Sequence, residues 1–134
     1  MDTCVLISAL RSKRGASFKI LSLLDSQKFE INLSIALVLE YETVAKRNAQ
    51  KLGLTEADIE ALIDYMCAVG KLRQIHFLWR PSLKDPSDDF ILELAVESAC
   101  HYIITHNIQD FAGAKKFKVK VITPQTFLKI IGGI

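Results

Sequence analysis

The sequence predicts an α/β domain in which a parallel β-sheet is flanked by helices on both faces, a three-layer sandwich. Short apolar runs rich in β-branched residues alternate with longer segments whose apolar residues recur at helical spacing. This alternation favours a parallel sheet covered by helices. A chain of 134 residues is long enough for one domain with a proper core and too short for two. We therefore expect a single domain over residues 1–134.

The N-terminal part of the chain predicts a helix followed by a strand. An apolar run over residues 5–10 leads into a basic loop over residues 11–15. Apolar residues over 18–24 then recur at helical spacing. Residues 31–35 are short, apolar and partly β-branched, which predicts a buried strand.

The middle of the chain predicts two consecutive helices. The first carries an apolar stripe over residues 37–45 and is closed by Gly53. The second begins at Thr55, because Thr55 with Asp58 three residues later is typical of a capping box, and it ends at Gly70.

The C-terminal half predicts alternating strands and helices. The expected elements are a strand over 75–78, a loop with two prolines over 80–87, a helix from Asp88 or Asp89, strands over 102–105 and 119–122, and a helix from Pro124. Proline suits the start of a helix because the amide groups of the first turn donate no hydrogen bond within the helix, so the amide hydrogen that proline lacks is not needed there.

The composition is that of an ordinary globular protein. Half of the residues are hydrophobic and 24% are charged, and the net charge of +2 neither indicates nor excludes a nucleic-acid partner. Basic residues gather locally instead, for example at Arg11, Lys13 and Arg14. A solvated surface explains any one such cluster more simply than a binding site does.

The cysteines and the absence of long apolar runs predict a cytoplasmic location. Cys4, Cys67 and Cys100 show no paired spacing and no zinc pattern, which suits a reducing compartment. No apolar run approaches the roughly 20 residues that span a bilayer. No basic start followed by an apolar stretch marks a signal peptide. We expect no membrane contact.

Four acidic residues occur where an alternating β/α chain would bring them to one edge of its sheet: Asp2, Glu40, Asp89 and Asp110. Parallel sheets form sites outside the carboxyl ends of their strands. Carboxylates without a basic partner repel one another, so their convergence predicts a cation between them. Mg²⁺ and Mn²⁺ prefer such oxygen ligands.

Helix capping is a simpler explanation for some of these acids. Asp2 alone would serve as a helix cap. Asp85, Asp88 and Asp89 precede or begin a predicted helix, whose positive end favours carboxylates. One acid suffices for capping, so three acids in five residues indicate a further role.

Four short motifs, in order along essentially the whole chain, resemble those of the PIN-domain ribonucleases, in particular the toxins of toxin–antitoxin pairs. The motifs are Asp2-Thr3-Cys4-Val5-Leu6, Glu40-Tyr41-Glu42-Thr43-Val44, Asp85-Pro86-Ser87-Asp88-Asp89, and Thr105-His106-Asn107 followed by Asp110-Phe111. Each motif is weak alone, and the four in register are considerably more specific.

The resemblance implies an Mg²⁺- or Mn²⁺-dependent endoribonuclease that cleaves single-stranded RNA and is held by an antitoxin protein. The implied catalytic and metal-binding residues are Asp2, Glu40, Asp89 and Asp110. Asp88, Asn107 and Thr105 would support them. Arg11, Lys13 and Arg14 would bind the RNA backbone.

The chain departs from the family pattern at two site positions. Cys4 stands where the family prefers Asn, so a hydrogen bond that supports Asp2 is expected to be lost. Asn107 stands where many members carry an acid, and Asp110 would then supply the fourth charge.

The resemblance also implies a strand before the first Asp, for which Met1 leaves no room. Loss of a central strand would leave unpaired backbone groups and an apolar gap. Residues before Met1 in the native protein would supply this strand, or residues 3–7 would join the sheet, or a neighbouring chain would fill the gap. We favour the first solution.

Two other functions remain open. A degenerate PIN domain without catalysis would act as an RNA- or protein-binding module, and Cys4, Asn107 and the missing first strand favour it. A phospho-acceptor signalling domain also has an acidic pocket at the edge of a parallel sheet, but no lysine clearly follows a late strand to complete that site, so we rank it last.

The helix expected over residues 55–70 has apolar residues on more than one side, which predicts a homodimer with an antitoxin peptide over the acidic groove.

Overall fold

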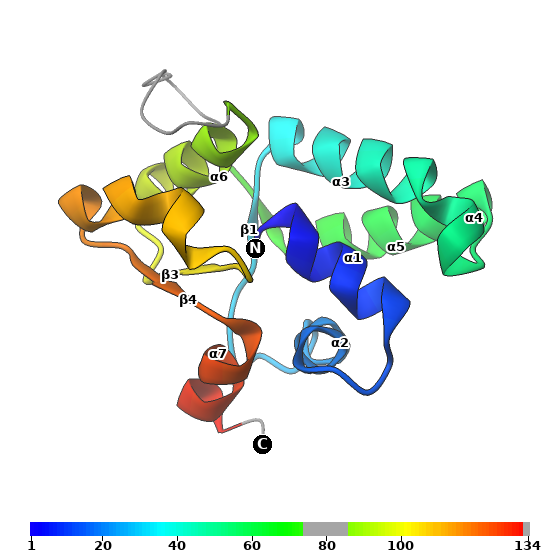
Figure 1. The fold of residues 1–134 in the computed structure, drawn as a ribbon, viewed down its shortest axis with the longest axis horizontal. Coiled ribbons are helices and arrows are strands. Elements are labelled where there is room, and N and C mark those ends of the chain that lie inside the picture. The colour runs from blue at the N-terminus through cyan, green and yellow to red at the C-terminus, as the bar shows by residue number, and fades with distance from the viewer. Residues whose placement is uncertain (74–85, 133–134) are drawn as a thin grey trace.

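The computed structural model describes residues 1–73 and 86–132, without the side chains of residues 86, 87, 89, 90, 115 and 116. Figure 1 shows a helix-rich α/β arrangement with the N-terminus at its centre, beside β1. The helices are α1 (Thr3–Arg11), α2 (Ala16–Ser22), α3 (Ile35–Arg47), α4 (Ala49–Leu52), α5 (Glu56–Val69), α6 (Pro86–Glu97) and α7 (Pro124–Ile131), with a 3₁₀ segment η1 (Ile108–Phe117).

The described strands form two separate parallel pairs. β1 (Asn32–Leu33) pairs with β2 (Lys71–Leu72), and β3 (Tyr102–Ile104) pairs with β4 (Lys120–Ile122). The parallel α/β character that the sequence predicts is confirmed. The single continuous sheet is not, because β1 and β3 do not pair with each other.

The first apolar run of the chain forms a helix. Asp2 has extended backbone angles at the N-cap position, and α1 follows at once, with Val5, Leu6 and Ala9 buried along one side. The hypothesis that residues 3–7 join the sheet is therefore wrong. The apolar residues of this segment are spaced for a helix and pack against α2 and α3.

The strand expected over residues 31–35 is confirmed in its centre, where Asn32 and Leu33 form β1. It ends earlier than expected because the Ser34 side chain accepts a hydrogen bond from the Leu37 amide at 3.1 Å and so caps α3. Gly53, in the left-handed conformation, ends the next turn of helix, α4, as predicted.

The capping box of α5 is confirmed. The Thr55 side chain accepts a hydrogen bond from the Asp58 amide, and the Asp58 carboxylate accepts one from the Thr55 amide. Gly70 ends the helix and leads directly into β2, a strand that the sequence did not predict. The strand expected over residues 75–78 lies outside the described residues.

The C-terminal elements lie close to their predicted positions. α6 begins at Pro86, two residues before Asp88, and β3, β4 and α7 match the predicted strands and helix. Thr123 caps α7, and Pro124 occupies its first turn. The 3₁₀ segment η1, which begins just after Asn107, was not predicted.

Helices cover two opposite faces of the strand region. Ile103 belongs to an apolar cluster that includes Ile91 and Leu92 of α6, whereas Ile104 packs with Ile20 of α2 and with α7. Successive residues of a strand point to opposite faces, so α6 covers one face of β3 and α2 with α7 cover the other. In the part of the chain that the structure describes, no helix is long and apolar enough to cross a membrane.

Candidate functional site

Asp2 is held at the carboxyl end of β3. Its backbone amide donates a hydrogen bond to the Ile104 carbonyl at 2.8 Å, and its side chain is only 8% exposed. The carboxylate does not cap α1. Instead, its Oδ2 atom accepts hydrogen bonds from the Thr105 hydroxyl at 2.6 Å and from the Cys4 thiol at 3.3 Å. The interpretation of Asp2 as a simple helix cap is therefore wrong.

Thr105 connects Asp2 with the loop that follows β3. Its side chain is fully buried, and its hydroxyl accepts a hydrogen bond from the Asn107 amide at 3.0 Å while donating to Asp2. One hydroxyl thus fixes both the Asp2 carboxylate and the start of the loop that carries Asn107. The sequence pointed to Thr105 as a supporting residue, and the geometry fits that role.

Cys4 keeps the contact that its replacement of Asn was expected to remove. The thiol donates to Asp2 and lies 3.7 Å from the Thr105 hydroxyl. Burial of the Cys4 side chain, more than the neighbouring Asp2 charge, raises the pKa of the thiol. A protonated thiol is the form that can donate to the carboxylate, so the expected loss of a supporting hydrogen bond is wrong.

Glu40 reaches the same region from α3. The hydroxyl of Thr3, the residue next to Asp2, donates to its Oε2 atom at 2.6 Å. Tyr41 lies beside both acids: burial raises the pKa of its hydroxyl well above the usual range, and the charges of Asp2 and Glu40 raise it further. The Tyr41 hydroxyl donates to the Met1 carbonyl, so the first residues of the chain are tied to α3. The sequence gave no sign of the contact from Thr3.

No cationic side chain neutralises these two carboxylates within the described part of the chain. The ion pairs there join Lys46 to Glu42 and Glu60, and Glu30 to Lys71 and Arg73. The hydrogen-bond donors to Asp2 and Glu40 are neutral hydroxyl and thiol groups. Two carboxylates with no basic side chain paired to either one offer oxygen ligands of the kind that a divalent metal ion prefers.

Of the two predicted site acids in α6, the structure describes the side chain of only one. Asp89 is in the first turns of α6, and its side chain lies outside the described residues. The Asp88 side chain is half-buried and has an interaction partner. Participation of Asp89 and Asp88 in the site therefore remains a prediction.

The loop after β3 brings Asn107 and Asp110 to the surface. Both side chains are exposed, and the Asp110 amide donates to the Asn107 carbonyl at 3.0 Å at the start of η1. No hydrogen bond between described residues links either side chain to Asp2 or Glu40. Nor do the described side chains include a group of three or more His, Cys, Asp or Glu residues placed to hold a metal ion. Asp110 as a ligand remains a prediction.

The predicted RNA-binding residues lie at the other end of α1. Arg11 is in the last turn of the helix, and Lys13 and Arg14 follow in an exposed turn. At 1.5 Å of rise per residue, the nine residues of α1 separate this cluster from Asp2 by about 13 Å. This position suits contacts with backbone phosphates that lie away from Asp2 and Glu40. It does not suit contact with a phosphate held between those two acids.

One polar contact beside the site was not foreseen. The buried Ser17 hydroxyl lies 3.2 Å from Nε2 of His106, the residue after Thr105. The contact anchors the loop after β3 to α2, which covers one face of the strand region.

A comparison with models of known families matches most of this chain. The sequence model of a family described as PIN domain matches residues 1–109. The match includes Asp2, Glu40, Asp89 and Asn107, and it ends just before Asp110. The search of curated proteins gives no match.

Proposed function

Because this chain belongs to the PIN-domain family, whose members are generally metal-dependent nucleases, we propose that it is an endoribonuclease that cleaves single-stranded RNA. The observation that carries the proposal is the joint placement of Asp2 and Glu40. Asp2 carries one carboxylate, and the hydroxyl of the next residue, Thr3, donates to the carboxylate of Glu40. No cationic side chain among the described residues compensates the two charges.

In this proposal Asp2 and Glu40 hold a Mg²⁺ or Mn²⁺ ion, and Asp89 and Asp110 complete the set. Thr105 orients the Asp2 carboxylate and Thr3 orients that of Glu40, since each donates a short hydrogen bond to one oxygen. Asp88 and Asn107 support the neighbouring loops. When bound, such an ion activates water and neutralises charge on the phosphate being cut.

We propose that RNA runs from the acids toward the end of α1. Arg11, Lys13 and Arg14 are exposed there, and their positive charge suits the phosphate backbone. Their distance from Asp2 means that they contribute affinity rather than chemistry.

We further propose that the protein is a cytoplasmic toxin, dimeric in solution and inhibited by an antitoxin. Apolar side chains that remain exposed support a protein partner: Ile35 and Leu39 of α3 are 66% and 57% exposed, and Tyr65 of α5 is 40% exposed. The helix α5 was expected to form such a surface, and the apolar side chains of α3 are the more exposed.

A second function is a metal-binding or RNA-binding module without catalysis. The observation that favours it is the exposed, separate position of Asp110, together with Asn107 in place of an acid. Such a site would bind an ion through Asp2 and Glu40 and fail to cut.

RNA cleavage by the purified chain tests the proposal. We expect degradation of single-stranded RNA with Mg²⁺ or Mn²⁺ and loss of it with chelator. We expect a loss of activity of about 100-fold or more in Asp89→Asn, because even a residue that only orients a metal ligand is worth about 10- to 100-fold. Asp64→Asn, an exposed acid of α5, is the control. Metal binding without cleavage in the unaltered chain would establish the binding module instead.

A further inference from the structure

His106 lies directly beside the acids, on the loop that follows β3. It comes immediately after Thr105, whose hydroxyl donates to the Asp2 carboxylate. The backbone of His106 also forms a hydrogen bond with the Cys4 thiol. The main chain at His106 is therefore tied to the groups that surround Asp2, and its imidazole ring starts from a defined position.

The imidazole ring of His106 is held at one of its two nitrogens. Its Nε2 atom lies 3.2 Å from the hydroxyl of Ser17, which is only 3% exposed and belongs to the first turn of α2. The His106 side chain itself is exposed, and no hydrogen bond between described residues involves its Nδ1 atom. When the Ser17 hydroxyl donates to Nε2, the ring proton is on Nδ1, which is then available as a hydrogen-bond donor.

The contact with Ser17 places the ring between the acids and a basic segment. Ser17 follows Gly15 by two residues, and Gly15 ends the exposed basic turn after α1. Residues 11–22 contain four basic and no acidic residues. An RNA strand that runs from Asp2 toward this turn, as the proposed function requires, would pass the His106 ring before it reaches the turn.

We propose that His106 binds a backbone phosphate of single-stranded RNA, between the acids and the basic turn, through a hydrogen bond from Nδ1. Ser17 is the positioning residue, since its hydroxyl fixes the ring by bonding to Nε2. Contacts with phosphate oxygens fix the register of a nucleic acid without reading its sequence. The inference takes its substrate class from the proposed function, but it concerns binding rather than cleavage.

His106→Gln separates the phosphate contact from the contact with Ser17. The Gln amide can reach the position of Nε2 and keep the bond to Ser17, but it offers no donor at the position of Nδ1. We expect the dissociation constant for a labelled single-stranded RNA to rise about tenfold, since a hydrogen bond to a charged group is worth that much or more. The melting temperature should stay the same. Fluorescence anisotropy in the presence of chelator measures binding without cleavage.

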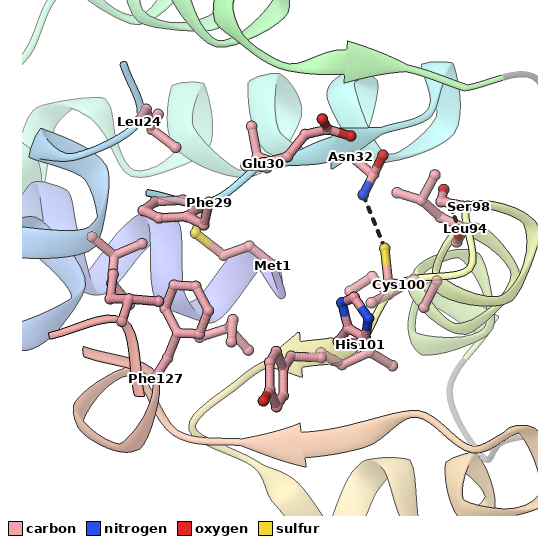
Figure 2. Close-up of a pocket in the computed structure, with 18 of the residues that line it drawn as sticks. Met1, Leu24, Phe29, Glu30, Asn32, Leu94, Ser98, Cys100, His101 and Phe127 are labelled. Carbon is pink, nitrogen blue, oxygen red and sulfur yellow. Dashed lines mark hydrogen bonds between the residues drawn. The ribbon is translucent and has the colours of Figure 1, made fainter. Parts of the chain in front are cut away.

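His101→Gln is the matched control. His101 is also exposed, but it precedes β3, at the opposite end of the strand from Asp2. Figure 2 shows it beside Cys100 at the cavity between β1 and β3. We expect this substitution to leave the RNA affinity unchanged. Equal affinities of the unaltered chain and His106→Gln would overturn the proposal, because Gln replaces a ring that only anchors the loop without loss.

A double substitution tests the role of Ser17. Ser17→Ala alone should weaken RNA binding, because the ring loses its anchor. Ser17→Ala combined with His106→Gln should bind RNA no more weakly than His106→Gln alone, since the hydroxyl acts only through the ring. Ser22→Ala, at an exposed position at the end of α2, is the control. Additive losses in the double variant would overturn the role of Ser17 as the positioning residue.

Nuclear magnetic resonance of the histidine ring nitrogens gives a direct measurement. We expect addition of the RNA to shift the Nδ1 resonance of His106 and to leave the ring resonances of His101 in place. Ring resonances of His106 that the RNA leaves unchanged would overturn the proposal.

Cleavage assays distinguish this inference from the proposed function. If the chain cuts RNA, His106→Gln should raise KM and leave kcat nearly unchanged, since the contact is made equally before and during the reaction. A chain whose RNA binding depends on His106 but that cuts no RNA with Mg²⁺ or Mn²⁺ would contradict the ribonuclease and support this inference. A loss in kcat with unchanged RNA affinity would overturn the binding role of His106.

Discussion

The Thr105 hydroxyl donates a 2.6 Å hydrogen bond to the Asp2 carboxylate, between residues 103 positions apart in the sequence. The bond joins the end of β3 to the start of α1, and both side chains are buried. Because the same hydroxyl accepts from the Asn107 amide, it sets the position of the acid and of the loop beside it. Thr105 is therefore the residue whose removal most directly tests the site geometry.

Thr105→Val keeps the shape of the side chain and removes the hydroxyl. We expect the free energy of unfolding to fall by about 1–3 kcal/mol, because the buried Asp2 carboxylate loses a donor. Affinity for Mn²⁺ should fall by about tenfold or more, as for other residues that orient a metal ligand. Urea unfolding and Mn²⁺ titration measure the two effects.

Thr43→Val, at an exposed position of α3, provides the matched control and should change neither quantity. Unchanged Mn²⁺ affinity in Thr105→Val would mean that Asp2 does not bind the ion through this geometry.

Asp2→Asn is expected to separate metal binding from folding. The amide oxygen can still accept from Thr105, and one of the two negative charges of the proposed site disappears. Without metal the variant should unfold at the same or a higher temperature than the unaltered chain. With Mg²⁺ or Mn²⁺ only the unaltered chain should gain stability, since a ligand stabilises the state that binds it.

Differential scanning calorimetry with and without the ion measures this gain. Asp25→Asn, an acid outside the proposed site, should keep it. If Asp2→Asn gains as much stability from the ion as the unaltered chain does, Asp2 is not a metal ligand.

Gly70→Ala is expected to destabilise the junction of α5 and β2. An added Cβ would lie 2.8 Å from the Met66 carbonyl oxygen and 2.9 Å from Cγ2 of Ile31, so the backbone must shift. We expect a loss of about 1–3 kcal/mol in the free energy of unfolding, as for overpacked cores. Gly15→Ala, whose Cβ would meet its nearest neighbour at 3.8 Å, is the control in the same urea titration and should be near neutral. Equal effects of the two substitutions would show that the close approach is not rigid.

The proposed homodimer can be tested at the exposed apolar residues of α3. The double substitution Ile35→Lys with Leu39→Lys places charge on the same side of the helix, one turn apart. Light scattering should show a dimer for the unaltered chain at micromolar concentration and a monomer for the variant. A monomer for the unaltered chain would contradict the prediction.

The sequence determined the local elements of this protein. The capping box of Thr55 and Asp58, the left-handed Gly53 and the helix start at Pro124 depend on residues within a few positions of one another, and each is confirmed. The parallel α/β class followed from the same local periodicity. Local patterns also failed in one place: β2 is an exposed strand of only two residues, and nothing in its sequence marks it as one.

Only the tertiary structure decided how the site is held and how the sheet is divided. The contacts from Thr3 to Glu40 and from Thr105 to Asp2 span 37 and 103 residues, and either hydroxyl could have faced solvent in another packing. The role of Cys4 as a donor likewise depends on its burial beside Asp2. Local spacing determines where a helix or strand forms, whereas contacts between distant side chains and strand edges exist only once packing brings them together.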